Sequence, residues 1–390
     1  MVVSPGVPGE MAHLQSAEAR GIPVIGELGL AAAVLQSADG AGGPLPMVAV
    51  TGTNGKSSTT WLLGQLLEQA GRRPFVGGNL GSPLSLEARA RLTGDLHHDC
   101  AVVEVSSYQL ERPGPFHPRS GVVLNLTPDH LARHGDMAVY ASVKLNLFLR
   151  MTPDDRAVLP LDDVWLPRTA LSWRKAAPPV LALGGHPGVI DHGDRLVFGG
   201  TDDDGELDLS AFTLPGAHNR TNLAAALLVG QGLGLDRSRI DLGALRPLPH
   251  RMEPIATDDG RRWINDSKAT NVDAARAGLT DLPPGAVVLL GGAGKAGADY
   301  ASLAPLLAPA GGVICFGGSG PDIQAALHAA RPTLPIHAAA ALSGAVAQAR
   351  ALSAPGDIIL LCPACASFDE FDHFEHRGQV FADLARGESP

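Results

Sequence analysis

A glycine-rich segment with a lysine and two serines is the strongest candidate for chemistry in this sequence. It reads Gly52-Thr-Asn-Gly-Lys-Ser-Ser58, and it lies between the apolar run Met47–Thr51 and a helical pattern. In such a context glycines let backbone N–H groups converge on one anion, Lys56 reaches the terminal phosphates of a nucleotide and Ser57 can bind Mg²⁺. The full pattern of phosphate loops has a glycine at the position of Val50, so an ordinary glycine-rich turn is the alternative.

Two side chains at the ends of later apolar runs could bind a metal ion. Glu104 ends the run Ala101–Glu104, and His130 follows the run Val122–Asn125. The carboxyl ends of neighbouring parallel strands meet at one edge of a sheet, so we expect both side chains near the phosphate loop. Carboxylate oxygens suit Mg²⁺, and an imidazole nitrogen is tolerated. Taken singly, Glu104 could be a surface carboxylate and His130 a loop histidine.

Two further patterns resemble metal or redox sites but lack a required residue. His130 and His134 stand one helical turn apart, yet Leu131 occupies the position where metalloproteases have glutamate. Cys362 and Cys365 have the spacing of a redox pair, but no second pair completes a zinc site. We interpret both cysteines as buried thiols near the end of a strand.

The elements that must position these residues alternate between short apolar strands and helices, which predicts α/β domains with parallel sheets. A first series begins at Met47, and a second series lies beyond the prolines of Leu245–Pro249, which predict a linker. The stretch Pro153–Leu214 looks like short strands and loops. We therefore predict a short amino-terminal segment, a P-loop ATPase domain with a parallel sheet and a Rossmann-like carboxy-terminal domain, at residues 1–46, 47–247 and 248–390.

Composition and charge limit the class of protein further. The 390 residues are 45% hydrophobic and 18% charged, enough apolar material for several cores. A formal net charge of −10 disfavours nucleic-acid binding. No secretory signal or long apolar span is visible, and four cysteines fit a reducing compartment, so we expect a cytoplasmic protein without a membrane partner.

Together these motifs resemble those of the Mur ligases, and among them the ligases that add D-glutamate in peptidoglycan synthesis. The phosphate loop with Glu104 and His130 carries the resemblance to the family, and the segments Asn265–Asn271 and Pro363–Asp369 carry the D-glutamate assignment. The resemblance covers nearly the whole chain. It implies a monomeric enzyme that uses ATP and Mg²⁺ to convert UDP-N-acetylmuramoyl-L-alanine into an acyl phosphate, which the amine of D-glutamate then attacks. Such an enzyme serves cell-wall biogenesis, cell shape and cell division.

The resemblance also implies roles for single residues. Lys56, Lys144, His130 and Glu104 would be catalytic, with Lys144 carbamylated so that a cation becomes a metal-binding anion. The metal ligands would be Ser57, Glu104, His130 and Lys144. The nucleotide would contact Gly52, Thr53, Asn54, Gly55, Lys56, Ser57, Ser58, Asn222, Arg251 and Asp266. The other substrates would contact Gly6, Asn79, Ser106, Lys268, Thr270, Lys295, Ser367 and Phe374.

The chain departs from the family pattern in places. Family members begin with a whole domain that binds uridine diphosphate, whereas this chain begins near the end of that domain, at Ser4-Pro-Gly6. We expect residues 1–46 to be a remnant of it, through a late start codon or a true loss. Cys362 replaces a usual serine, and His373 replaces a common asparagine. The alternatives are another amide ligase of this architecture, such as a folylpolyglutamate synthase or a Mur ligase for a different amino acid, and a non-catalytic nucleotide-binding module.

Overall fold

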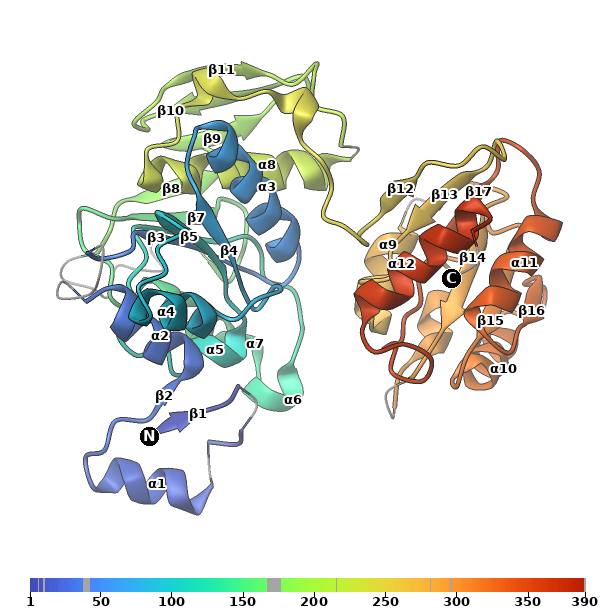
Figure 1. Ribbon diagram of the computed structural model, residues 1–390, viewed down its shortest axis with the longest axis horizontal. Helices are drawn as coiled ribbons and strands as arrows, with labels where there is room; N and C mark the ends of the chain where they lie inside the picture. Colours follow the sequence, from blue (N-terminus) through green and yellow to red (C-terminus); the bar gives the residue numbers. More distant parts are fainter. Residues whose placement is uncertain are drawn as a thin grey trace. The chain divides into compact units, whose positions relative to one another are not determined.

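The chain forms two compact units, Met1–Arg246 and Pro247–Pro390 (Figure 1). The structure is a computed structural model that describes residues 1–5, 7–9, 11–37, 43–166, 177–214, 216–280, 282–294 and 297–388. Each unit contains a mostly parallel sheet with helices, which confirms the predicted α/β class. Gly6 and Lys295, both expected to contact substrate, lie outside the described residues.

The first unit begins with a small parallel pair of strands. β1 (Val2–Val3) pairs with β2 (Ile25–Gly26), and α1 (Ala12–Ala19) lies between them in sequence. Helix α2 (Glu27–Leu35) follows directly, and its buried residues Leu28, Ala31, Ala32 and Leu35 join the core of the larger sheet. The first 46 residues are thus part of the first compact unit.

A nine-stranded sheet forms the centre of the first unit, in the order β11-β10-β9-β8-β7-β6-β3-β5-β4. All neighbours from β4 to β9 pair in parallel, and β10 and β11 add antiparallel edges. The strands are β3 (Met47–Thr51), β4 (Pro74–Gly78), β5 (Cys100–Glu104), β6 (Ser120–Val123), β7 (Arg156–Pro160), β8 (Val180–Leu183), β9 (Gly188–Asp191), β10 (Arg195–Gly199) and β11 (Gly205–Asp208).

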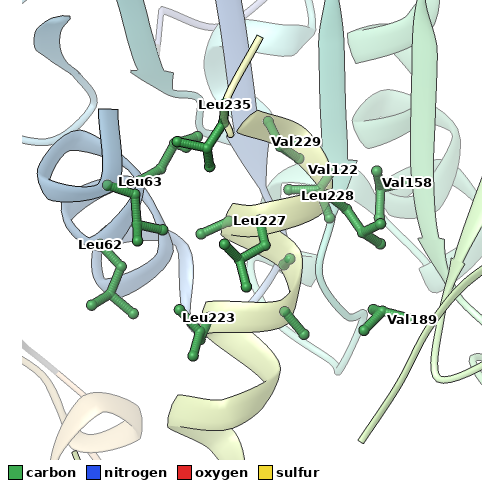
Figure 2. Close-up of a cluster of buried hydrophobic side chains, with 14 of the residues drawn as sticks. Leu62, Leu63, Val122, Val158, Val189, Leu223, Leu227, Leu228, Val229 and Leu235 are labelled. Atoms are coloured by element: carbon green, nitrogen blue, oxygen red, sulfur yellow. The ribbon is translucent and has the colours of Figure 1, made fainter. Parts of the chain in front are cut away.

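Alternating side chains of these strands feed two separate cores, because successive residues of a strand point to opposite faces. In β3, Val48 and Val50 belong to one core and Met47 and Ala49 to the other. The first core packs α3 (Lys56–Gln69) against α8 (Ala217–Gly230), as Figure 2 shows for leucines and valines of both helices and of neighbouring strands. The second core covers the other face with α2, α4 (Leu84–Leu92) and α7 (Met137–Leu145).

Two sequence expectations need adjustment in this unit. The strand expected over Val122–Asn125 is β6 at Ser120–Val123, so Leu124 and Asn125 leave the sheet. The stretch Pro153–Leu214 does contain short strands, and three of them extend the parallel sheet. The other short helices in the described part of this unit are α5 (Ser107–Leu110), α6 (Leu131–His134), η1 (Asn146–Phe148), η3 (Gln231–Leu233), η4 (Arg237–Arg239) and η5 (Leu242–Ala244).

The second unit has a six-stranded sheet in the order β12-β13-β17-β14-β15-β16, parallel except for the β12–β13 pair. Its strands are β12 (Glu253–Ile255), β13 (Arg262–Asn265), β14 (Val287–Gly291), β15 (Gly312–Phe316), β16 (Ile336–Ala338) and β17 (Ile358–Leu361). One face packs on α9 (Val272–Leu279) and α10 (Gly320–Ala330) with η6 (Tyr300–Leu303). The other face packs on α11 (Leu342–Leu352) and α12 (Phe374–Arg386).

Candidate active site

The glycine-rich segment is the turn between β3 and α3, as its sequence predicts. Gly55 caps the helix with φ 84°, a left-handed conformation that favours glycine. A Cβ at Gly55 would lie 2.5 Å from Asn222 Oδ1, so no larger residue fits without displacing that side chain. The amino end of the 14-residue helix α3 therefore begins directly at Lys56, where its dipole favours an anion.

A second loop, directly after β6, holds the first one in place. The amide N–H of Asn54 donates to Asn125 Oδ1 at 2.9 Å, and Asn125 Nδ2 donates back to the Asn54 carbonyl at 3.1 Å. The hydroxyl of Thr53 accepts from the Thr127 amide at 3.1 Å and lies 3.2 Å from the Tyr140 hydroxyl. These contacts need the chain to leave the sheet after Val123, which is why the predicted longer strand is not formed.

Two lysine amines converge on one carbonyl of the loop. Lys56 Nζ donates to the carbonyls of Gly52 at 3.0 Å and Thr53 at 2.7 Å. Lys144 Nζ donates to the same Gly52 carbonyl at 2.9 Å and to Thr51 Oγ1 at 3.4 Å. Lys144 reaches this point because α7 buries the face that carries Tyr140, Ala141 and Lys144. The sequence alone shows only a lysine in a helix.

Burial of these amines changes their protonation. Desolvation, reinforced by the nearby charge of Lys56, lowers the pKa of Lys144 to about 7, because the charged ammonium loses water. Desolvation also lowers the pKa of Lys56, while the carboxylates of Glu104 and Asp129 oppose that shift. Lys144 is therefore partly an uncharged, nucleophilic amine at neutral pH.

Glu104 ends β5 with its side chain almost fully buried. Its Oε1 accepts a hydrogen bond from Asn79 Nδ2 at 2.7 Å, so two predicted site residues meet here. Its Oε2 is buried and has no hydrogen-bond partner among the described residues. An unsatisfied buried carboxylate oxygen is costly unless a cation or donor binds it, so this atom fits a ligand of Mg²⁺. No three His, Cys, Asp or Glu side chains gather as a metal site within the described ranges.

Among the described residues, His130 forms no hydrogen bond or ion pair with the phosphate loop or with Glu104. It caps α6 with φ 54°, its Nε2 lies 3.3 Å from Asp129 Oδ2, and its ring meets Tyr108 edge-on at 5.1 Å. His134 instead is buried, with Nε2 3.0 Å from Ser107 Oγ, and burial lowers its pKa. The rings of both histidines lie beside the Tyr108 ring, at 5.1 and 5.8 Å between centroids.

Two other predicted residues of the first unit have clear structural contacts. Asn222 Oδ1 accepts a hydrogen bond from Thr59 Oγ1 at 3.2 Å and also faces Gly55, which ties α8 to the start of α3. Ser106 caps α5, because its side chain accepts from the Gln109 amide in a capping box. The Asn222 contact thus lies at the phosphate loop, whereas the Ser106 contact is local to α5.

In the second unit, Arg251 and Asp266 form a partly buried ion pair. Arg251 Nη1 lies 3.4 Å from Asp266 Oδ1, which also accepts from the Met252 amide at 3.3 Å. Asp266 is completely buried, and desolvation raises its pKa to about 6 against the opposing effect of Arg251. The sequence predicted both residues at one site, and the structure brings them together.

Residues expected to recognise the amino acid also cluster in the second unit. Lys268 Nζ lies 4.9 Å from the centre of the Phe374 ring, and the Ser267 hydroxyl donates to the Phe374 carbonyl at 2.8 Å. Thr270 follows two residues later and donates its amide to the Lys268 carbonyl at 2.8 Å. Ser367 lies buried in the loop after β17.

Known proteins match both units of this chain. Residues 50–230 match the Mur ligase middle domain, and residues 250–365 match the Mur ligase glutamate ligase domain. The chain belongs to the Mur ligase family.

Individual members of the family are similar to this chain over most of its length. The chain is 41% identical to the UDP-N-acetylmuramoylalanine–D-glutamate ligase of Anaeromyxobacter dehalogenans, over 99% of this chain and 83% of that protein. It is 40% identical to the enzyme of that name from Myxococcus xanthus, over 98% of this chain and 83% of that protein. The crystal structure of MurF ligase from Thermotoga maritima in complex with ADP has the same fold, with a TM-score of 0.65 at 18% identity over 99% and 94% of the two chains.

Several residues that shape the site of this Mur ligase were not predicted from the sequence. Asn125 clamps the phosphate loop, and Asp129 is close enough to affect the pKa of both lysines. Both are polar residues just after a buried strand, a signal that could have identified them. Arg377 is fully buried in α12 and left no such signal. Among the described helices, none combines the length and apolar character of a transmembrane span.

Proposed function

We propose that this Mur ligase joins D-glutamate to UDP-N-acetylmuramoyl-L-alanine at the expense of ATP, in the synthesis of peptidoglycan precursors. The observation that carries the proposal is the convergence of Lys56 and Lys144 on the Gly52 carbonyl, in a unit where Glu104 presents an unpaired oxygen. The choice of D-glutamate is supported by the printed names of the relatives from A. dehalogenans and M. xanthus. We expect the reaction in the cytoplasm, where ATP and nucleotide-linked sugars are made.

Lys56 would act on the terminal phosphates of ATP. In the free protein its amine is folded back onto two loop carbonyls. A phosphate oxygen is a stronger acceptor than a carbonyl, so the bound nucleotide would draw the amine away from them. The ammonium would then oppose the charge that develops on the transferred phosphoryl group. The other nucleotide contacts would be Gly52, Thr53, Asn54, Gly55, Ser57, Ser58, Asn222, Arg251 and Asp266.

Mg²⁺ would be held by oxygen ligands and by the imidazole nitrogen of His130. Glu104 Oε2 is unpaired, Ser57 lies in the first turn of α3, and His130 follows β6. When bound, the ion neutralises charge on the phosphates. Lys144 would complete the set after its neutral amine attacks CO2: the new N–C bond gives a carbamate anion, and the nitrogen loses one proton. A pKa of about 7 supplies that neutral amine.

The bond-forming steps follow from the chemistry of carboxylates. A carboxylate oxygen of the L-alanine residue attacks the terminal phosphorus, ADP leaves, and the resulting acyl phosphate is attacked at carbon by the amine of D-glutamate. Inorganic phosphate then leaves as the amide forms. The chain contributes binding and orientation, since both reactants must be held in line for each attack. Gly6, Asn79 and Ser106 would contact the nucleotide-linked sugar peptide.

The second unit would supply the amino-acid site. Lys268 and Lys295 would offer cations for two carboxylates, Thr270 and Ser367 would offer hydroxyl groups, and Phe374 would offer its ring. Within this proposal residues 1–46 belong to the uridine-diphosphate-binding domain, residues 47–247 form the ATP-binding domain and residues 248–390 form the amino-acid-binding domain. The enzyme would work as a monomer.

An assay of ADP release tests the proposal. The purified chain is mixed with Mg-ATP, UDP-N-acetylmuramoyl-L-alanine and one amino acid from a panel of D-glutamate, L-glutamate, L-lysine and meso-diaminopimelate. We expect release that depends on both the nucleotide sugar and D-glutamate, with the amide product found by mass spectrometry. Stimulation by L-lysine but not by D-glutamate would mean a ligase for another amino acid. Binding of ATP without any release would favour a non-catalytic nucleotide-binding module.

A further inference from the structure

We propose that Arg377 is a positioning residue that holds the amino-acid site of this ligase in shape from below and supplies positive potential to it. The inference rests on the proposed function for the identity of the site, and it assigns a role to a residue that contacts none of the reacting groups.

Arg377 lies in the first turns of α12, with its side chain completely buried. The Nε–H group donates to Ser267 Oγ at 3.0 Å. Nη1 donates to the carbonyls of Ala366 at 3.0 Å and Gly291 at 3.5 Å, and Nη2 to those of Ser267 at 2.9 Å and Cys365 at 3.1 Å. A guanidinium has five N–H donors in a fixed plane, so every one of them has an acceptor here.

These acceptors come from the carboxyl ends of three adjacent strands. Ser267 follows β13, Gly291 ends β14, and Cys365 and Ala366 follow β17, which lies between the other two. One side chain therefore contacts all three loops, in addition to the direct backbone bond from the Ala293 amide to the Ala366 carbonyl at 2.9 Å. A Cβ on Gly292 would come within 2.9 Å of Arg377 Nη1, which shows how closely the backbone wraps the guanidinium.

The three loops carry the residues proposed to recognise D-glutamate. Lys268 follows Ser267 in the chain, and Ser367 follows Ala366. The Ser267 hydroxyl also links Arg377 to the backbone of Phe374, because it accepts from Arg377 Nε and donates to the Phe374 carbonyl at 2.8 Å. Arg377 thus fixes the backbone at each of these positions while its own atoms stay beneath the surface.

The charge of Arg377 has no ion-pair partner among the described residues, although the carboxylates of Asp369 and Glu370 lie near enough to favour its charged form. In the part of the second unit that the structure describes, no carboxylate lies within ion-pair distance of its guanidinium. Burial lowers the pKa of Arg377 to about 10, so the group still carries its charge at neutral pH. A buried charge without an anion is costly for stability, and an acidic ligand above it would reduce that cost. The arrangement therefore favours an amino acid with two carboxylates over a neutral or basic one.

Replacement of Arg377 by lysine separates the effect of its positive charge from the effect of its five hydrogen bonds. An ammonium has three donors at one point and cannot reach all five acceptors, although it keeps the positive charge. The matched control is Arg261→Lys in the same unit. Arg261 also donates mainly to backbone, to the carbonyls of Ser353 at 2.8 Å and Arg350 at 3.1 Å, but it lies at the opposite, amino end of β13.

The test uses the full chain and two readouts. In Arg377→Lys we expect the KM for D-glutamate to rise about tenfold or more, since displaced loops lose charge-assisted contacts, while the KM for ATP changes less than about threefold. Amide hydrogen exchange should speed up in 266–271, 291–294 and 363–374. Arg261→Lys should leave the KM for D-glutamate and exchange in these segments unchanged, even at a similar loss of thermal stability.

The outcomes separate this inference from the proposed function. If Arg377→Lys folds and keeps both the wild-type KM for D-glutamate and wild-type exchange in the three segments, the positioning role is wrong. A rise in KM by the same factor for ATP and D-glutamate would also contradict it, because only a general loss of structure acts so evenly. If the wild-type chain ligates no D-glutamate but exchange rises only in the three segments, the proposed function fails and the positioning role stands.

Discussion

The two units of the chain use buried cations in opposite ways. In the first unit the amines of Lys56 and Lys144 share one carbonyl, that of Gly52, and both have lowered pKa values. In the second unit the guanidinium of Arg377 divides its donors among the ends of three strands. An ammonium on a flexible stem changes partners and protonation readily, whereas a planar guanidinium keeps both. The first unit thus holds amines that can change their hydrogen-bond partners and their protonation. The second unit holds a guanidinium that keeps both its partners and its charge.

Removal of Lys56 should have the largest effect, because its ammonium lies at the start of α3, where the terminal phosphates would bind. We expect Lys56→Ala to lower the rate of ADP release by about 1000-fold or more, as the loss of a charge that opposes the transferred phosphoryl group would predict. Stopped assays of ADP release at saturating ATP measure this. Thermal melting should show a folded protein. Near-normal turnover would contradict the assignment of phosphoryl transfer to Lys56 in the first unit.

Lys144→Ala should have the next largest effect, and it should be partly reversible. We expect about a 100-fold loss of activity, since the amine that can become a carbamate anion is gone, with partial recovery when acetate or chloride at high concentration takes the place of the anion. Activity is measured across a series of sodium acetate concentrations. Lys56→Ala under the same salts is the control and should not recover. Failure of any anion to restore Lys144→Ala would leave carbamylation without support.

Gly55 and Gly71 have nearly the same positive φ but different surroundings. Substitutions at the two positions therefore separate the cost of backbone strain from the effect of a contact at the phosphate loop. Gly55 has φ 84° and faces Asn222 Oδ1, whereas Gly71 has φ 81° and open space around it. Alanine in a left-handed conformation costs about 1 kcal/mol, so both Gly55→Ala and Gly71→Ala should lose that much stability. Only Gly55→Ala should also raise the KM for ATP, by about tenfold. Equal kinetic behaviour of the two variants would show that the space beside Asn222 does not matter.

A final prediction concerns the free energy of unfolding as a function of pH. Lys144 has a pKa of about 7 in the folded chain against 10.5 for an ordinary lysine. Between these values the unfolded chain binds a proton that the folded chain lacks, so the free energy of unfolding should rise with pH, by up to about 1.4 kcal/mol per pH unit. Lys144→Met lacks this group and isolates it from other titrating residues. Melting points of both proteins from pH 7 to 10 measure the difference, and parallel curves would show that Lys144 has an ordinary pKa.

Much of this architecture could be predicted because local sequence reports it. The strands Met47–Thr51 and Arg262–Asn265 agree with the predicted runs residue by residue, since each is a short apolar run with a turn residue beside it. The phosphate loop was visible for the same reason, because its glycines, lysine and serines are consecutive. The end of β6 was placed two residues too late, since nothing local to Leu124 and Asn125 shows that the phosphate loop binds them.

The sequence by itself determined which residues could carry chemistry: a strand, a glycine turn and Lys56 at the start of a helix are neighbours in the chain, and so are Asn265 to Asn271. Only the tertiary structure decided how charged groups behave. The low pKa of Lys144, the unpaired oxygen of Glu104 and the five contacts of Arg377 depend on burial by segments distant in sequence. Desolvation and hydrogen bonding are properties of surroundings, and surroundings exist only after the chain has folded.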